Sequence, residues 1–139
     1  MKNKILEVKH KNNLYAIIIK KKNKFLKKGV NFVTKNHDLI QLGFLNHKKN
    51  HKIKSHIHYK KPRTISYCTE VLLIEKGKVK VKFYDFNSKD IKKDKILDSG
   101  DIIVLFKGGH GFTILKKTQI IEIKQGPYIK NNDKKIIRN

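Results

Sequence analysis

The chain has 139 residues, near the usual size of one folded domain, and its 34 lysines and arginines against 11 acidic residues give a formal net charge of +23. Only Arg63 and Arg138 are arginines and Ala16 is the only alanine, which is typical of an AT-rich coding bias that places lysine on polar surfaces. Because nucleic-acid readers use arginine and exposed aromatic residues, we predict no specific nucleic-acid partner, although the charge favours anionic ligands and weak polyanion binding.

Cysteine use and hydropathy indicate the compartment. Cys68 is the only cysteine, so no internal disulfide can form, and we expect it to be a buried structural thiol. The amino terminus has no signal-peptide pattern, and the apolar run around Ile17–Ile19 is far shorter than the ~20 residues that a membrane helix needs. We therefore expect a cytoplasmic protein with no membrane partner.

The first third of the chain contains short strand candidates separated by lysine-rich or glycine-containing segments. These candidates are Leu14–Ile19, Phe25–Leu26, Val30–Val33 and Leu39–Leu45. The segment 1–35 has no chemical motif, so we expect its extra strands to cover a sheet edge or to contact a second subunit. This favours a homodimer.

Two histidines mark the middle of the chain. His56 and His58 lie two residues apart in a stretch that we expect to be a strand, so both imidazoles would point to the same face. Such a pair can bind a metal ion, or can simply be exposed. His47 and His51 lie among lysines and are expected to be ordinary surface residues.

The second half of the chain alternates short apolar runs with glycine turns. We predict a hairpin in which Val71–Ile74 and Lys78–Tyr84 are joined by a tight turn at Lys76-Gly77, followed by a solvated loop to Lys95. Further predicted elements are a turn at Ser99–Asp101, a strand at Ile102–Phe106, a turn at Gly108–Gly111, and strands at Phe112–Leu115 and Gln119–Lys124. This spacing predicts an all-β sandwich or barrel, with a polar tail over residues 129–139.

Two motifs in this half resemble those of the cupin superfamily. The first is His56-Ile-His58, then, after a long spacer, Glu70 and six residues to Gly77; the second is Gly100-Asp101, a strand, and Gly108-Gly109-His110. The likeness covers roughly residues 50–128. It implies one cupin domain over residues 1–139, built as a double-stranded β-helix or jelly-roll barrel.

The resemblance implies a metal site made by His56, His58, Glu70 and His110. Three imidazoles and one carboxylate suit one divalent ion of Fe, Mn, Ni, Co or Zn and leave a position open to substrate. The candidate substrate-binding residues are Arg63, Gln125 and Tyr128. A guanidinium can grip a carboxylate or phosphate with two parallel bonds, although Arg63 can equally be an ordinary surface arginine.

The same resemblance implies a metal-dependent isomerase or epimerase that acts on a small polar or anionic molecule such as a sugar derivative. An Fe(II)-dependent dioxygenase, a non-enzymatic binding or sensing protein, and a metal-free sugar-nucleotide ketoisomerase that uses His56 or His58 as acid or base remain alternatives. Fold does not settle function, so the sequence leaves these open.

Overall fold

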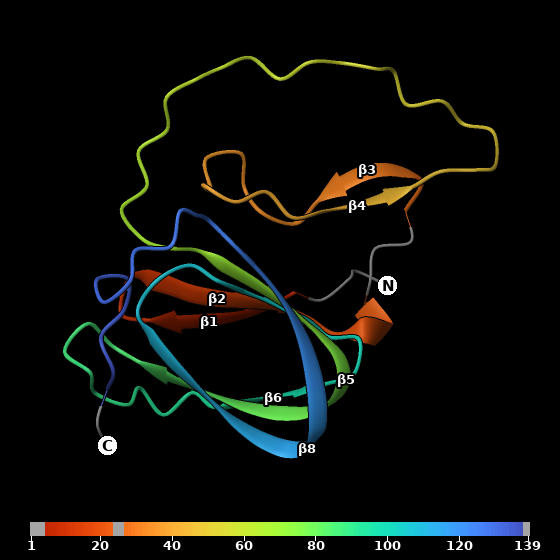
Figure 1. Cartoon of the computed structure of the whole chain (residues 1–139). Helices are drawn as coiled ribbons and strands as arrows, with labels where there is room; N and C mark the ends of the chain where they lie inside the picture. Colours follow the sequence, from red (N-terminus) through yellow and green to blue (C-terminus); the bar gives the residue numbers. More distant parts are fainter. Residues whose placement is uncertain (1–4, 24–26, 138–139) are drawn as a thin grey trace. The chain divides into compact units, whose positions relative to one another are not determined.

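The computed structural model describes residues 5–23 and 27–137, which belong to two compact units (Figure 1). The sheet unit combines Met1–Asn23 with Tyr67–Asn139, and the hairpin unit is Lys24–Ser66. The predicted strand at Phe25–Leu26 lies outside the described residues. No helix in the described part of the chain is long and apolar enough to cross a membrane.

The sheet unit contains one antiparallel sheet, which has six strands in the described residues and curls like half of a barrel (Figure 1). The strand order is β1-β2-β7-β5-β6, and β8 pairs with the other edge of β5. The elements are β1 (Leu6–His10), β2 (Asn13–Ile19), the 3-10 turn η1 (Lys21–Asn23), β5 (Glu70–Tyr84), β6 (Lys95–Asp98), β7 (Ile102–Leu105) and β8 (Gly109–Lys124). The all-β prediction is confirmed; the jelly-roll connectivity of a cupin stays a prediction.

Strand β5 is the centre of this sheet. One of its edges pairs with β8 along almost the whole strand. The other edge pairs with β7 at its beginning, from Glu70 to Leu73, and with β6 further on, from Lys78 to Val81. Strands β6 and β7 therefore lie end to end, joined by the Ser99-Gly100 turn that the sequence predicted.

The predicted hairpin at Lys76-Gly77 is wrong, because the chain continues through Gly77 as a single strand. Gly77 has a φ of +96°, and a Cβ atom at this position would overlap Lys117 O and Thr118 Oγ1. The pairing with β8 is irregular between Ile74 and Val79, so the glycine bends and bulges the strand instead of reversing it. Each half of β5 has partners on both edges, and this holds the strand continuous across the bend.

Two other predicted boundaries also differ from the structure. The predicted strands Phe112–Leu115 and Gln119–Lys124 are parts of the one strand β8, which follows β5 around its bend. The predicted turn at Gly108–Gly111 ends earlier, since β8 begins at Gly109 and includes His110. Strand β1, which the sequence did not predict, pairs with β2 at one end of the sheet.

The core lies on the concave face of the curled sheet. Leu72 and Ile74 point into it before the bend, and Val79, Val81 and Phe83 do so after it. The change from even to odd positions is the one-residue shift that a bulge introduces into a strand's alternation. The other buried members of the cluster are Val8, Tyr15, Ala16, Ile18, Ile91, Leu97, Ile103 and Leu105.

The hairpin unit contains a small antiparallel pair, β3 (Gly29–Phe32) and β4 (Gly43–Asn46), which overlap the segments predicted as strands at Val30–Val33 and Leu39–Leu45. The strand predicted around His56 and His58 is not formed, since residues 51–65 have no regular secondary structure and are all exposed. The alternating pattern suits a strand, but a strand also needs a pairing edge and an apolar face to bury. Ile57 is 91% exposed here, so no such burial takes place.

Candidate functional site

Glu70 and His110 lie together at the rim of the curled sheet. His110 Nε2 is 3.0 Å from Glu70 Oε2, and the two side chains are 27% and 18% exposed. Glu70 is the first residue of β5 and His110 the second residue of β8. The structure thus brings together two of the four predicted metal ligands, which lie 40 positions apart in the sequence.

The topology explains why these two side chains meet. Leu105, the last residue of β7, pairs with Glu70, and only residues 106–108 separate it from β8. Residues two positions apart on a strand point to the same face. Glu70 therefore faces the same side as the buried Leu72, and His110 the same side as Phe112, which packs against the core. Both site side chains thus point to the core side of the sheet. The rings of Phe112 and His110 make an edge contact at 5.5 Å, which fixes the imidazole.

The charges around Glu70 keep it ionised. The hydrogen bond with His110 is the main cause that lowers the pKa of Glu70, and the charges of His110, Lys124 and Lys134 act in the same direction against the effect of burial. Lys124 Nζ lies 3.9 Å from Glu70 and 3.0 Å from Glu122. Glu122 is the main cause that raises the pKa of Lys124. The site therefore combines a carboxylate, an imidazole and an ammonium group.

Gln125 contacts Thr69, the residue that precedes Glu70, and brings a hydrogen-bond donor that has no partner in the described part of the chain. The Thr69 backbone N–H donates to Gln125 Oε1 at 2.6 Å, which fixes the orientation of the amide. Gln125 Nε2 is then buried and has no hydrogen-bond partner among the residues that the structure describes. A buried donor without an acceptor costs about 1–3 kcal/mol, so this nitrogen marks a place for a ligand oxygen or a water.

The remaining predicted site residues are exposed. His56 and His58 belong to the hairpin unit, where their rings make an edge contact at 4.9 Å and His56 Nδ1 lies 2.9 Å from Lys54 O. Arg63 lies in the same exposed stretch, and Tyr128 is 64% exposed. Within residues 5–23 and 27–137, no group of three or more His, Cys, Asp or Glu side chains is placed to hold a metal ion. The four-ligand site therefore stays a prediction.

Cys68 is exposed, which corrects the expectation of a buried thiol. It lies at the end of the exposed stretch 51–68, two residues before β5 begins, so the sheet does not cover it. Partial burial of the sulfur, the main cause, and the nearby Glu70 carboxylate raise the pKa of Cys68.

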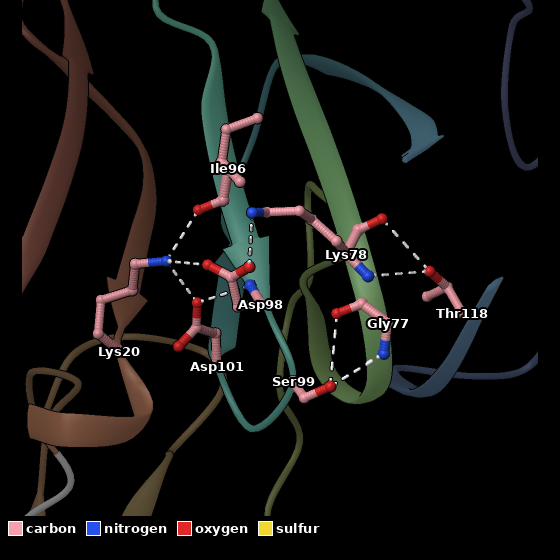
Figure 2. A network of polar contacts seen from close by, with 8 residues as sticks. All are labelled: Lys20, Gly77, Lys78, Ile96, Asp98, Ser99, Asp101 and Thr118. Carbon is pink, nitrogen blue, oxygen red and sulfur yellow. Dashed lines mark hydrogen bonds and ion pairs between the residues drawn. The ribbon is translucent and has the colours of Figure 1, made fainter. Parts of the chain in front are cut away.

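Sequence reasoning missed a polar network at the β6–β7 corner (Figure 2). Asp101, only 3% exposed, accepts hydrogen bonds from Lys20 Nζ at 2.5 Å, from Lys21 N at 2.8 Å and from Asp98 N at 2.8 Å. An open depression of about 640 Å³ lies here, lined by Lys20, Lys21, Lys22, Asp98, Ser99 and Asp101. Because Asp101 is satisfied by these partners, its role is to fix the corner. The only signal in the sequence is its place after Ser99-Gly100.

Comparisons with known protein families, with curated proteins and with solved structures found no match to this chain. The curled all-β sheet is compatible with a β-barrel. Membership of the cupin superfamily, the homodimer and the cytoplasmic location stay predictions from the sequence.

Proposed function

We propose that the protein is a metal-binding protein of the cupin type, in which Glu70 and His110 hold a divalent ion and a small anionic or sugar-like molecule binds beside it. The observation that carries this proposal is the 3.0 Å separation of Nε2 and Oε2. In an octahedral site, ligand atoms about 2.1 Å from the ion and about 90° apart lie about 3.0 Å from each other. The two donor atoms therefore already have the spacing of neighbouring ligands.

The protonation state of the carboxylate also supports the proposal. A metal ligand must be deprotonated, and the lowered pKa of Glu70 keeps its carboxylate ionised well below neutral pH. Both side chains are partly buried, which limits competition from water. A bound ion would act as a Lewis acid that polarises a substrate oxygen.

The groups around the pair favour an anionic ligand. Gln125 Nε2 is a buried donor without a partner in the described structure, and Lys124 brings a positive charge to Glu70. Together they can orient a carboxylate, phosphate or sugar hydroxyl next to the ion. The net charge of +23 adds a long-range attraction for anions.

For the reaction we keep the isomerase or epimerase type as the proposal, with the Fe(II)-dependent dioxygenase and the non-enzymatic binding protein as alternatives. Oxygen consumption distinguishes a dioxygenase, and binding without turnover distinguishes a sensor. One observation favours a metal-free acid–base site as a second candidate: the Glu70 carboxylate can hold a proton on His110 Nε2, as carboxylates orient catalytic imidazoles. Activity that survives a chelator would select it.

The test is a titration of the whole chain with Zn²⁺, Mn²⁺ and Co²⁺ by calorimetry, together with the metal content of the purified protein. We expect near-stoichiometric binding to the parent protein. Glu70→Gln and His110→Gln each weaken it at least about tenfold, because each removes a ligand. Glu122→Gln is the matched control: it removes an exposed carboxylate that pairs with Lys124, and it leaves metal affinity unchanged.

The predicted contribution of His56 and His58 is tested in the same titration. If either histidine is a ligand, His56→Gln or His58→Gln lowers the affinity as strongly as His110→Gln does. Unchanged affinity in both variants would remove them from the site. A parent protein that takes up no ion after reconstitution would overturn the metal proposal as a whole.

A further inference from the structure

The positive charge of this chain is distributed differently in its two units. Asp38 is the only one of the 11 acidic residues that lies in the hairpin unit. In the sheet unit, lysines of β5 face acids: Lys78 lies 3.2 Å from Asp98, Lys80 3.9 Å from Asp94 and Lys82 3.3 Å from Asp90. A coding bias toward lysine explains many lysines, but it does not explain why the acids are missing from one unit.

In the hairpin unit, 11 cationic residues face a single acid, and seven of those cations lie in residues 47–66, which we name the basic loop. It contains Lys48, Lys49, Lys52, Lys54, Lys60, Lys61 and Arg63, four histidines and no acidic residue. Among the residues that the structure describes, none of these seven cationic side chains is in an ion pair. Like charges this close repel one another, and binding a polyanion relieves that repulsion.

The loop also has a regular alternation. Lys52, Lys54, His56, His58 and Lys60 occupy every second position, with Ile53, Ser55, Ile57 and Tyr59 between them. In an extended chain this places the basic groups on one side and the apolar groups on the other. Figure 1 shows the loop drawn out without helix or strand, and residues 51–66 are all exposed.

We propose that the basic loop binds single-stranded nucleic acid without sequence preference. Single-strand binding combines cationic groups that follow the phosphates with exposed rings on which bases stack. Tyr59 is 86% exposed, and the imidazoles of His56 and His58, on the lysine side of the alternation, are exposed as well. Lysine neutralises phosphates but lacks the two-pronged base contact of arginine, so no sequence is read.

Two features favour this partner over others. Binding to a membrane surface calls for an apolar face on an amphipathic helix, whereas the loop has no helix. Base reading in a duplex calls for an element that fills the major groove, and the loop has no such element. The proposal does not need Glu70 or His110, which lie outside the loop; it shares only His56 and His58 with the predicted four-ligand metal site.

The test is fluorescence anisotropy of the whole chain with a labelled oligouridylate of about 20 nucleotides at about 100 mM salt. The loop variant carries Lys52→Gln, Lys54→Gln and Lys60→Gln. The control carries Lys76→Gln, Lys93→Gln and Lys117→Gln, three exposed lysines of the sheet unit without an ion pair in the described structure, and has the same net charge. We expect the loop variant to bind at least about tenfold more weakly and the control less than about twofold.

The salt dependence and one further variant make the test specific. Each lysine that neutralises a phosphate contributes about 0.7 to the slope of log affinity against log salt, so the loop variant loses about 2 from the slope. Tyr59→Ala weakens binding about fivefold or more at unchanged slope, because it removes stacking and no charge. Equal weakening in the loop variant and the control would overturn the proposal. It would also be overturned by binding to phosphatidylserine vesicles with no binding to the oligonucleotide at the same salt.

Discussion

Replacement of Asp101 by asparagine tests the explanation of the β6–β7 corner. The two oxygens of Asp101 accept three hydrogen bonds: Oδ2 accepts from Lys20 Nζ and Asp98 N, and Oδ1 accepts from Lys21 N. The backbone adds to this corner, since Asp101 O accepts from Ile74 N at 3.0 Å. The side chain thus ties η1 and the end of β6 to the residue that precedes β7. Figure 2 shows its bonds to Lys20 and Asp98.

The size of the effect follows from this count of acceptors. Asparagine keeps the shape but has one oxygen, so in either orientation its NH₂ group faces a donor. The best orientation keeps the bonds to Lys20 and Asp98 and leaves the Lys21 N–H without an acceptor, which costs about 1–3 kcal/mol. Loss of the charge that strengthens the bond to Lys20 costs about as much again. We expect Asp101→Asn to lower the free energy of unfolding by about 3 kcal/mol.

The assay is urea unfolding followed by circular dichroism, because the chain contains no tryptophan. The matched control is Asp94→Asn, which removes the same charge from a 37% exposed side chain whose partner Lys80 is 3.9 Å away. Exposed pairs contribute little, so this control should change stability by less than about 1 kcal/mol. A loss below about 1 kcal/mol in Asp101→Asn, with an unchanged dependence on urea, would refute the reasoning.

Three further predictions concern the bend, the ion pair and the thiol. Gly77→Ala should lower the free energy of unfolding in urea by more than Gly29→Ala does. Both glycines have a φ above +90°, but of the two only Gly77 would place a Cβ in overlap with other atoms. Equal losses in the two variants would contradict this. Because Glu70 has a folded-state pKa below 4.5, its ionised form stabilises the fold above about that pH and the stabilisation is lost as the pH falls through the folded pKa. The difference in unfolding midpoint between the parent and Glu70→Gln should therefore shrink from about pH 5.5 to about pH 3.5, and a constant difference would count against the pair. Cys68 should react with iodoacetamide in the native protein, at a rate that keeps rising above pH 9.0 because its pKa is raised; labelling only after denaturation would show that it is buried.

The sequence carries enough information to predict an all-β protein and some of its strands. Strand β2 is a β-branched run and β7 a continuous apolar run, and such local signals depend little on the rest of the chain. The contact between Glu70 and His110 was predicted from two short motifs. Its physical basis is the connection of residues 106–108 between β7 and β8, which leaves His110 little freedom to move away from Glu70.

The sequence could not distinguish a turn from a bend at Gly77. A glycine with positive φ suits a hairpin turn and a bulge equally well, and the choice depends on which edges are available for pairing. Here β7 and β6 lie end to end along one edge of β5, and β8 covers the other. These partners extend to Lys124, 40 residues beyond the end of β5, so no pattern within the 70–84 segment reports them.

The pattern around His56 and His58 shows the converse case, in which a strand signal exists without a strand. The alternation of basic with other residues in the basic loop predicted a strand in a sheet. The same alternation also occurs in an extended, unpaired segment whose basic side chains lie along one side. The two interpretations differ in burial, and the exposure of residues 51–66 favours the second. The composition of the whole chain does not show where the acids lie: ten of the eleven are in the sheet unit, where several pair with lysines, and the basic loop has none.

His56 and His58 are therefore the residues on which the two proposals compete. As metal ligands they bind the ion through a ring nitrogen, whereas in the basic loop their exposed rings stack on bases. The His56→Gln and His58→Gln variants separate these roles, because one loss appears in the metal titration and the other in the anisotropy. A loss confined to anisotropy would leave Glu70 and His110 as the metal-binding core of the sheet unit. A loss confined to the titration would make the basic loop the missing half of the metal site and leave the lysines alone to bind nucleic acid.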